Sequence, residues 1–304
     1  MRWNRWAGPC ALLVGALGAA GQGLPAQRDL AYVERGTPEQ TLDLYLPGGQ
    51  DFATVIFVHG GSLQRGDDRN SDFYAQVQEP FVAAGIACAK IDYRVAPEHR
   101  WPAMPQDVAT ATRWVRERVA TLGGDPSRIF LFGHSSGALL VAVLGNNAKY
   151  LQAVGMQPSD LAGIVPMGAT MAPLRETLAW AAQSGVDTDS LRVLFAREAD
   201  EVYATLEDRL DADPSRFVGA HTPPTLIVLA ERERFLPPVL EQAALLVRLM
   251  YDAERPADLV IVPGTHKSSI ADLAAQGDPA FAAIRRFIEN PHAAGEGSRP
   301  SSIR

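Results

Sequence analysis

The sequence predicts an α/β fold in which a mostly parallel central sheet is flanked by helices. Short apolar runs rich in β-branched residues alternate with longer helical patterns along most of the chain. This alternation is typical of parallel sheets, because a crossover helix must return the chain to the end where the next strand starts. The composition agrees with a single α/β domain. With 304 residues, 47% hydrophobic and 21% charged, the chain suffices for one large α/β domain and is unlike disordered, collagen-like or coiled-coil chains.

Strands are predicted where apolar, β-rich residues fill a short run. In chain order these runs are 42–46, 54–58, 86–93, 128–132, 161–167, 225–229 and 259–262. Helices are predicted where a longer helical pattern follows such a run. In chain order these segments are 103–120, 136–147, 238–250 and 279–288.

One stretch, 172–221, interrupts the alternation. It is charged and helix-prone, with Leu, Trp and Phe at mixed spacings, and it stands between two predicted strands. An insertion at this point lies at the carboxyl ends of the strands, where open α/β sheets bind their ligands. We therefore expect a small helical cap over the site; the alternative is a set of helices that only completes the outer layer.

The two ends of the chain are not expected to belong to the folded domain. Residues 1–26 are predicted to be an export signal, because Arg2 and Arg5 precede an apolar run over 7–20 that small residues follow. The run is shorter than the roughly 20 apolar residues that span a bilayer, although an uncleaved anchor is the alternative reading. We expect a secreted or periplasmic domain over 27–290 without a membrane span, followed by a flexible polar tail over 291–304.

Charge and cysteine content narrow the possible partners. The net charge is -7, and lysine occurs only at Lys90, Lys149 and Lys267, so no basic face is expected that would bind nucleic acid. Of the two cysteines, one lies in the predicted signal, so no intramolecular disulfide is expected after cleavage. The other, Cys88, lies in an apolar run and is predicted to be a buried strand residue.

The sharpest motif is Gly133-His-Ser-Ser-Gly137, which follows a β-rich run and opens a helical pattern. Small residues permit a strained strand-to-helix turn that holds a serine hydroxyl out above the sheet. The helix that follows presents its N-terminus to developing negative charge. Ser135 is therefore predicted to be a nucleophile.

A second strand, 54–58, ends in His59-Gly60-Gly61. Loops of this type supply backbone N–H groups within about 3 Å of a developing oxyanion, and glycine allows that approach. Gly60 and Gly61 are predicted to be oxyanion donors together with the N–H of Ser136. His59 is expected to fix the loop by hydrogen bonding rather than to act as the base.

A serine nucleophile needs a histidine that accepts its proton. In the order nucleophile, acid, histidine, two histidines come late enough, His266 and His292. His266 lies just after the last predicted strand, where a loop can bring it over Ser135, whereas His292 lies in the polar tail.

The acid should follow the strand 225–229, where Glu231 and Glu233 both stand. Glu233 is preferred because it lies further into the turn towards the next helix, from which its side chain can reach the histidine loop. Asp200 and Asp258 are remote alternatives. No cofactor is predicted, because the sequence shows neither a phosphate nor a dinucleotide loop, and no metal site, because no histidines are paired with carboxylates at ligand spacing.

Taken together, the motifs resemble the α/β-hydrolase carboxylesterases related to hormone-sensitive lipase and to the bacterial feruloyl-esterase-like hydrolases. The resemblance covers about residues 38–290. The matching segments, in the family's order, are His59-Gly-Gly-Ser, Asp92-Tyr-Arg-Val-Ala-Pro-Glu-His-Arg-Trp-Pro-Ala103, Gly123-Gly-Asp-Pro-Ser-Arg-Ile129, Gly133-His-Ser-Ser-Gly137, Pro223-Pro-Thr-Leu-Ile-Val228 and Gly264-Thr-His266.

The resemblance implies an α/β-hydrolase fold, a triad at Ser135, Glu233 and His266, and hydrolysis of small or short-chain carboxylic esters through an acyl-enzyme. The sequence departs from the family's pattern at Glu233, where Asp is usual, and at Ser62, where a third glycine is common. An arylformamidase, a feruloyl or acetylxylan esterase, and an inactive binding protein on the same fold remain alternatives. The partner that we expect is a small-molecule ester.

Overall fold

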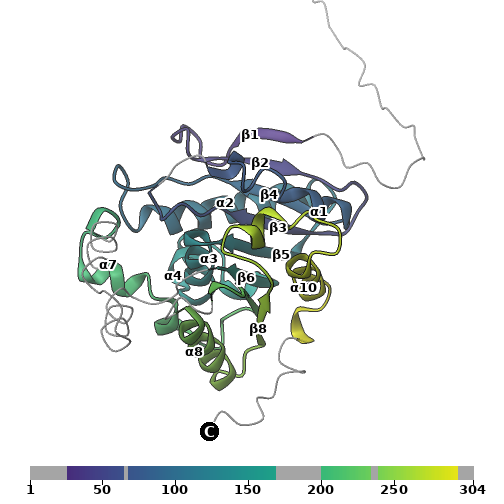
Figure 1. Ribbon diagram of the computed structural model, residues 1–304. Coiled ribbons are helices and arrows are strands. Elements are labelled where there is room, and N and C mark those ends of the chain that lie inside the picture. Colours follow the sequence, from purple (N-terminus) through teal and green to yellow (C-terminus); the bar gives the residue numbers. More distant parts are fainter. Residues whose placement is uncertain (1–25, 65–67, 169–199, 234–238, 294–304) are drawn as a thin grey trace, which may run out of the picture.

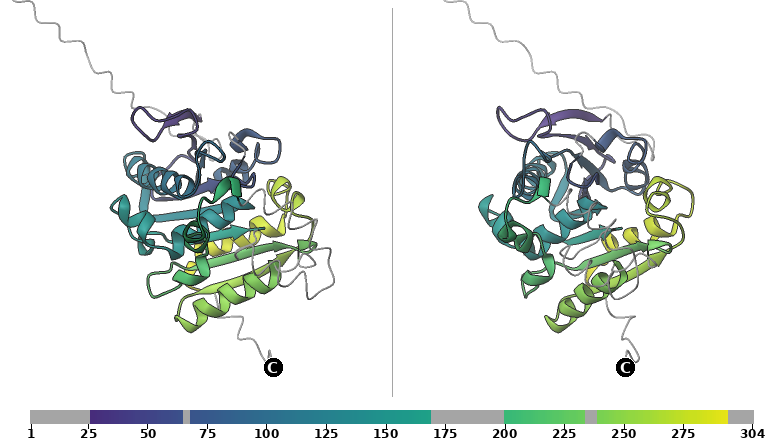
Figure 2. Two further views of the ribbon diagram at one scale, coloured as in Figure 1. Left: turned by 90° about the vertical axis from the view of Figure 1, so that its left-hand side faces the viewer. Right: turned by 60° about the vertical axis from the view of Figure 1, so that its left-hand side comes forward.

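The computed structural model describes residues 26–64, 68–168, 200–233 and 239–293, which form an eight-stranded sheet with helices on both faces (Figures 1 and 2). The strand order is β1-β2-β4-β3-β5-β6-β7-β8. β1 and β2 run antiparallel at one edge, and all pairs from β4 to β8 are parallel. The predicted fold class is confirmed.

The strands are β1 (Gln27–Ala31), β2 (Thr41–Tyr45), β3 (Phe52–Val58), β4 (Ala87–Ile91), β5 (Gly124–His134), β6 (Gly163–Met167), β7 (Thr225–Ala230) and β8 (Ala257–Val262). The central strands β3, β4, β6 and β7 are buried along their whole length. β1 is missing from the sequence prediction because its residues Gln-Arg-Asp-Leu-Ala are mostly polar, which is tolerated at a half-exposed edge.

The α-helices are α1 (Gln78–Ala83), α2 (Ala103–Ala120), α3 (Ser136–Asn146), α4 (Lys149–Ala153), α7 (Leu206–Asp211), α8 (Val239–Asp252), α9 (Ser268–Ala271) and α10 (Pro279–Glu289). Short 3-10 helices lie at η1 (Asp68–Asn70), η2 (Pro158–Asp160), η3 (Pro214–Phe217) and η5 (Pro291–Ala293). The predicted helices match α2, α3, α8 and α10 to within a few residues.

Side chains alternate between the two faces of β3, so the core has two main layers. Ile56 packs in the layer that α2 and α3 cover, and Phe57 packs in the layer that α1 and α10 cover. Figure 1 shows α1 and α10 on the opposite side of the sheet from α3 and α8. Helix α3 is buried on almost every side, as an apolar helix in the middle of a fold must be, and this fixes its N-terminus where β5 ends.

Parts of the predicted organisation lie outside the described residues. These parts are the export signal up to residue 25, the cap from 172 to 199, and the tail from 294 onwards. The remainder of the cap stretch contains α7 and η3. In the part of the chain that is described, no helix is long and apolar enough to cross a membrane.

Cys88 lies fully buried in β4, as predicted. Burial raises the pKa of its thiol to about 12, with a smaller opposite effect from Lys90. The thiolate form that reacts with electrophiles is therefore strongly disfavoured.

Candidate active site

Ser135 lies at the turn between β5 and α3 with a φ of 56°, in the left-handed region that side-chain-bearing residues rarely adopt. Two close approaches hold the turn. A Cβ at Gly133 would lie 2.2 Å from the carbonyl oxygen of Gly137, and a Cβ at Gly137 would lie 2.1 Å from that of Val58. Only glycine fits at both positions, which is the physical reason for the Gly-x-Ser-x-Gly pattern.

Backbone hydrogen bonds fix the orientation of this turn. The Ser135 N–H donates to the carbonyl of Met167 at the end of β6 over 2.9 Å, and the Ala138 N–H donates to the Ser135 carbonyl over 2.9 Å. The N–H of Ser136 is the first of α3 and therefore has no acceptor within the helix. It stands at the positive end of the helix dipole, next to the Ser135 hydroxyl.

The structure brings Glu233 and His266 together. The Nδ1–H of His266 donates to Oε1 of Glu233 over 2.5 Å, and Oε2 of Glu233 accepts from the Ala230 N–H over 2.7 Å. The Glu233 side chain is buried, whereas that of His266 is 40% exposed. Glu231, the competing carboxylate, is exposed. Of the two candidate carboxylates, Glu233 is the one that contacts the imidazole of His266.

Three contacts place this pair beside Ser135. The ring of His134, the residue before the serine, lies 4.6 Å from the ring of His266, centroid to centroid. A Cβ at Gly168, which follows Met167, would lie 2.9 Å from Glu233 Oε1 and 3.1 Å from His266 Nδ1. Within the described residues no hydrogen bond joins the Ser135 hydroxyl to His266, and such bonds are often long before substrate binds.

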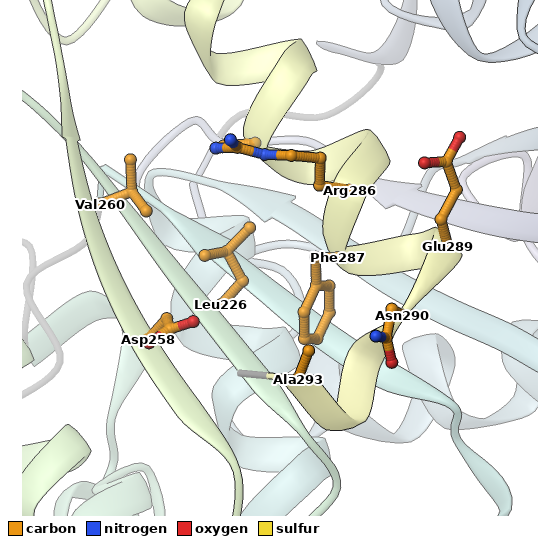
Figure 3. A pocket seen from close by; sticks show the side chains of 9 residues that line it. Leu226, Asp258, Val260, Arg286, Phe287, Glu289, Asn290 and Ala293 are labelled. Atoms are coloured by element: carbon orange, nitrogen blue, oxygen red, sulfur yellow. The ribbon is translucent and has the colours of Figure 1, made fainter. Parts of the chain in front are cut away.

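The other sequence candidates lie elsewhere. Asp200 forms an ion pair with Arg209 over 2.6 Å, and His292 is exposed in η5. Asp258 lines a hollow of about 420 Å³ between β7, β8 and α10 (Figure 3). That hollow opens at the amino-terminal ends of the strands, away from Ser135, which follows the carboxyl end of β5.

The loop after β3 passes directly against the nucleophile. A Cβ at Gly60 would lie 2.8 Å from the Cβ of Ser135, so this position requires glycine. Its N–H, however, donates to the Tyr74 hydroxyl over 3.1 Å. The sequence prediction assigns the Gly60 N–H to the oxyanion, whereas in the structure this N–H already donates to Tyr74.

The backbone N–H groups of the next two residues are further candidates for the oxyanion donors. Gly61 and Ser62 adopt φ values of 115° and 59°, and among the described residues neither N–H forms a hydrogen bond. Further along, the Leu63 N–H donates to the Ser136 hydroxyl over 3.3 Å, which ties the loop to the start of α3. Ser62 is a candidate that motif reading missed; its place as the third residue after His59 was the available signal.

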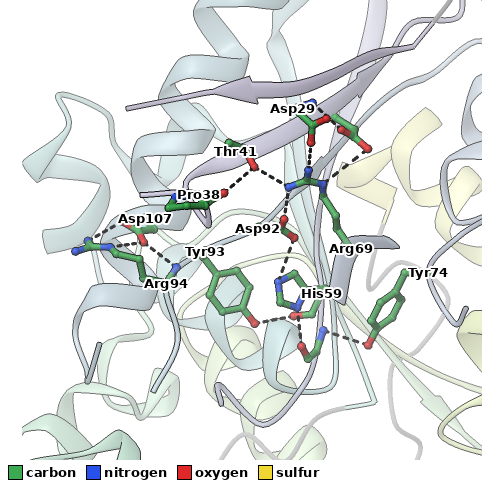
Figure 4. Close-up of polar contacts among 12 residues, drawn as sticks. Asp29, Pro38, Thr41, His59, Arg69, Tyr74, Asp92, Tyr93, Arg94 and Asp107 are labelled. Atoms are coloured by element: carbon green, nitrogen blue, oxygen red, sulfur yellow. Dashed lines mark hydrogen bonds and ion pairs between the residues drawn. The ribbon is translucent and has the colours of Figure 1, made fainter. Parts of the chain in front are cut away.

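His59 fixes this loop and is fully buried. Its Nδ1–H donates to the Gly60 carbonyl over 2.6 Å, and its ring stacks on that of Tyr93 with 4.4 Å between centroids (Figure 4). The Tyr93 hydroxyl donates to the His59 carbonyl over 2.9 Å. Asp92 Oδ1 lies 3.6 Å from His59 Nε2. These contacts agree with the expectation that His59 is structural rather than the base.

Arg69 contacts Asp92, the residue whose carboxylate lies next to His59 (Figure 4). Its guanidinium is 4% exposed and pairs with the buried carboxylate of Asp92, donates to Asp29 over 2.6 Å and to Thr41 over 2.8 Å, and lies 3.8 Å from Asp43. A charge this deeply buried is tolerated only when it is paired and hydrogen-bonded. The sequence does not single out Arg69.

The described part of the cap stretch is anchored to the body through Asp211 at the end of α7. Its carboxylate accepts from Trp101 Nε1 and Asn147 Nδ2, each over 2.9 Å, from the Tyr150 hydroxyl, and from Lys149 Nζ over 2.5 Å. Burial alone would raise the pKa of Asp211, but these donors outweigh it and the pKa is lowered.

A second contact joins the cap stretch to the oxyanion loop. Gln64 Nε2 donates to Glu201 Oε2 over 2.9 Å. The described part of the cap stretch therefore lies next to the loop after β3. No cluster of histidine, cysteine and carboxylate side chains that could hold a metal ion is present in the described ranges.

Comparisons with known proteins agree with this fold. The family model described as BD-FAE matches residues 42–249. Esterase LipC of Mycobacterium tuberculosis is 33% identical over 273 residues, which are 84% of this chain and 63% of LipC, so the chain spans less than two thirds of that relative. Ethyl acetate hydrolase of Pseudomonas putida is 27% identical over 251 residues, covering 78% of this chain and 74% of the relative.

Among solved structures, a truncated carbohydrate esterase from gut microbiota has a TM-score of 0.69 at 22% identity, covering 90% of this chain and 98% of that one. At this level of identity the similarity establishes the fold.

Proposed function

The chain belongs to the BD-FAE family, and from that premise we propose that it hydrolyses small carboxylic esters through an acyl-enzyme formed on Ser135. The observation that carries the proposal is one arrangement. A serine stands on a strained turn at a helix N-terminus, and the ring of its neighbour His134 lies 4.6 Å from that of a histidine whose Nδ1–H is held by a buried carboxylate over 2.5 Å.

The chemistry follows from the tautomer of His266. Because Nδ1 donates its proton to Glu233, the unprotonated nitrogen of the neutral ring is Nε2, which accepts the Ser135 hydroxyl proton. The serine oxygen attacks the ester carbonyl, and the alcohol leaves with the proton that His266 returns to it. Water, deprotonated by the same nitrogen, then attacks the acyl-enzyme, and the carboxylic acid is released.

We assign the oxyanion to the N–H groups of Gly61, Ser62 and Ser136. The Gly60 N–H is excluded from this set because it donates to Tyr74. Backbone donors fixed in place before the reaction stabilise developing charge without reorganisation, and each is worth roughly a hundredfold to a thousandfold in rate.

Small esters are the substrate class that we propose. Two relatives support this choice, one named an esterase and the other an ethyl acetate hydrolase. The cap stretch, held by Asp211 and by the contact of Glu201 with Gln64, borders the site and is expected to limit the size of the acyl group.

The test is hydrolysis of p-nitrophenyl esters from acetate to palmitate, with methyl ferulate and N-formylkynurenine alongside. We expect short-chain esters to react fastest and Ser135→Ala to lower kcat at least about a thousandfold, because only binding and oxyanion contributions remain. Ser127→Ala, which removes an exposed serine hydroxyl at a distant turn, is the matched control and should keep full activity.

Three outcomes would overturn the proposal. Activity of Ser135→Ala within tenfold of the wild type would exclude Ser135 as the nucleophile. Failure of a fluorophosphonate probe to label Ser135, with no ester or amide hydrolysed, would favour a binding protein on this fold. Cleavage of the formamide alone would move the chain to the formamidases.

A further inference from the structure

The side chain of His134 contacts the loop after β8 (residues 263–267, the histidine loop) directly and reaches the loop after β3 (residues 59–64, the oxyanion loop) through Tyr74. Its Nδ1 lies 2.9 Å from the Tyr74 hydroxyl, which in turn accepts the Gly60 N–H over 3.1 Å. Its Nε2 lies 2.9 Å from the backbone carbonyl of His266. A continuous chain of hydrogen bonds therefore runs from the loop after β3 to the loop that holds the catalytic histidine.

The direction of each hydrogen bond in this chain is fixed by chemistry. A carbonyl oxygen only accepts, so His134 Nε2 carries the proton that it donates to His266. In a neutral imidazole Nδ1 is then an acceptor, and the Tyr74 hydroxyl donates to it while accepting from Gly60. Burial, aided by the charge of His266, lowers the pKa of His134 to about 3, which keeps the ring neutral and this tautomer in place.

Packing leaves these side chains little freedom. The Tyr74 ring lies 5.1 Å from that of Phe57 and 5.7 Å from that of His134, centroid to centroid. Tyr74 and His134 are 5% and 3% exposed. Rotation of either ring would leave buried polar groups without partners, which costs more than the hydrogen bond itself contributes.

We propose that Tyr74 and His134 are positioning residues that couple the oxyanion loop to the catalytic histidine loop, so that the oxyanion donors and the base are set relative to Ser135 as one unit. Tyr74 holds the Gly60 peptide, which leaves the donors of Gly61 and Ser62 for the oxyanion. His134 holds the backbone carbonyl of His266. This inference rests on the proposed function for its effect on catalysis.

The first measurement compares Tyr74→Phe with Tyr251→Phe. Both remove one hydroxyl, but Tyr251 lies on α8 and is 69% exposed. We expect Tyr74→Phe to lower kcat about tenfold to a hundredfold, as small misplacements of reacting groups do, with KM within twofold. Tyr251→Phe should leave both unchanged. Equal kcat values for the two variants would overturn the proposal.

The second measurement separates the two ends of His134. Asparagine places an acceptor near the position of Nδ1 and keeps the contact to Tyr74, whereas glutamine reaches the position of Nε2 and keeps the donor to His266. In a double-mutant cycle, Tyr74→Phe should lower kcat less in either the His134→Asn or the His134→Gln background than in the wild type, because each His134 variant already breaks one end of the link. An effect of Tyr74→Phe as large in both backgrounds as in the wild type would contradict coupling through His134.

A third measurement does not depend on activity. In protein labelled with ¹⁵N-histidine, Tyr74→Phe should shift the ring nitrogen signals of His134 and His266, while Tyr251→Phe should shift neither. If the wild type hydrolysed no ester, the proposed function would fail, yet this readout would still decide the coupling. Unchanged His266 signals in Tyr74→Phe would overturn it even in an active enzyme.

Discussion

The two halves of the site are built in opposite ways. The oxyanion half, after β3 and β4, holds a fully buried histidine between the Tyr93 ring, a loop carbonyl and Asp92, with Arg69 behind them. The acid–histidine half, after β7 and β8, orients a side chain that is 40% exposed through Glu233 alone. Several contacts hold His59 in the oxyanion half, whereas one hydrogen bond, to Glu233, holds the side chain of His266.

The difference follows from what each half must do. Oxyanion donors are backbone groups that work by staying still, and several contacts keep the left-handed conformation at Gly61 and Ser62 from relaxing. In the proposed mechanism His266 must instead receive a proton, return it and face the substrate. A single buried carboxylate fixes its tautomer without enclosing the ring. Loss of the Glu233 contact should therefore lower mainly the reaction rate. Loss of a contact in the oxyanion half should lower mainly the stability of the fold.

The largest effect is expected for Glu233→Gln. The amide can still fill the space, but it no longer stabilises the charged imidazole or selects the reactive tautomer, so kcat should fall by about a thousandfold to ten-thousandfold. The free energy of unfolding should change by less than about 1 kcal/mol, as for other near-isosteric changes. Steady-state kinetics and chemical denaturation check both expectations.

The control for this experiment is Glu231→Gln, which changes the neighbouring exposed carboxylate. It should leave kcat within twofold of the wild type. A greater loss of activity in Glu231→Gln than in Glu233→Gln would show that the acid is the other glutamate.

These two carboxylates also show how far the sequence reaches. Ser135 could be predicted because the strand, the glycine spacing and the helix that define its turn are contiguous. Glu233 could be preferred over Glu231 because its place depends on a short turn after β7. The hydrogen bond from Gly60 to Tyr74 could not, because it joins a loop to a segment 14 residues away through a hydroxyl that no local pattern marks.

Arg69 was missed for a related reason. It stands in Gly-Asp-Asp-Arg-Asn-Ser, a polar run typical of an exposed loop, and its burial depends on Asp92, which is 23 residues further along the chain. The fold shows the same limit at its edge. β3 and β7 are apolar and easily recognised, whereas the polar β1 is a strand only because β2 offers it a partner.

The second prediction concerns Arg69, which stabilises the oxyanion half through Asp92. In Arg69→Met the carboxylate of Asp92 remains buried without its cation, so the free energy of unfolding should fall by about 3–5 kcal/mol. In the folded fraction kcat should fall about tenfold, because His59 loses the support of Asp92. Denaturation followed by fluorescence, with kinetics on the same samples, measures both.

Arg113→Met is the matched control, since Arg113 forms an exposed pair with Glu117 on α2. Such pairs contribute about 0–1 kcal/mol, so its denaturation curve should nearly overlay that of the wild type. Similar stabilities for the two arginine variants would show that the buried network does not support the oxyanion half.

The smallest effect concerns His134, which joins the two halves, and it appears only when the pH is changed. Because burial lowers its pKa to about 3 in the folded protein, the unfolded chain takes up a proton near the usual value of about 6.5 that the folded chain does not. Its contribution to stability is therefore complete above about pH 6.5 and is lost as the pH falls towards 3, with a slope of at most about 1.4 kcal/mol per pH unit. Free energies of unfolding for the wild type and His134→Gln should converge between pH 6 and pH 4, whereas His292→Gln, which changes an exposed histidine, should stay parallel to the wild type. Parallel curves for all three proteins would mean that His134 is not held neutral between the two loops, and the contact that joins the two halves would lose its fixed direction.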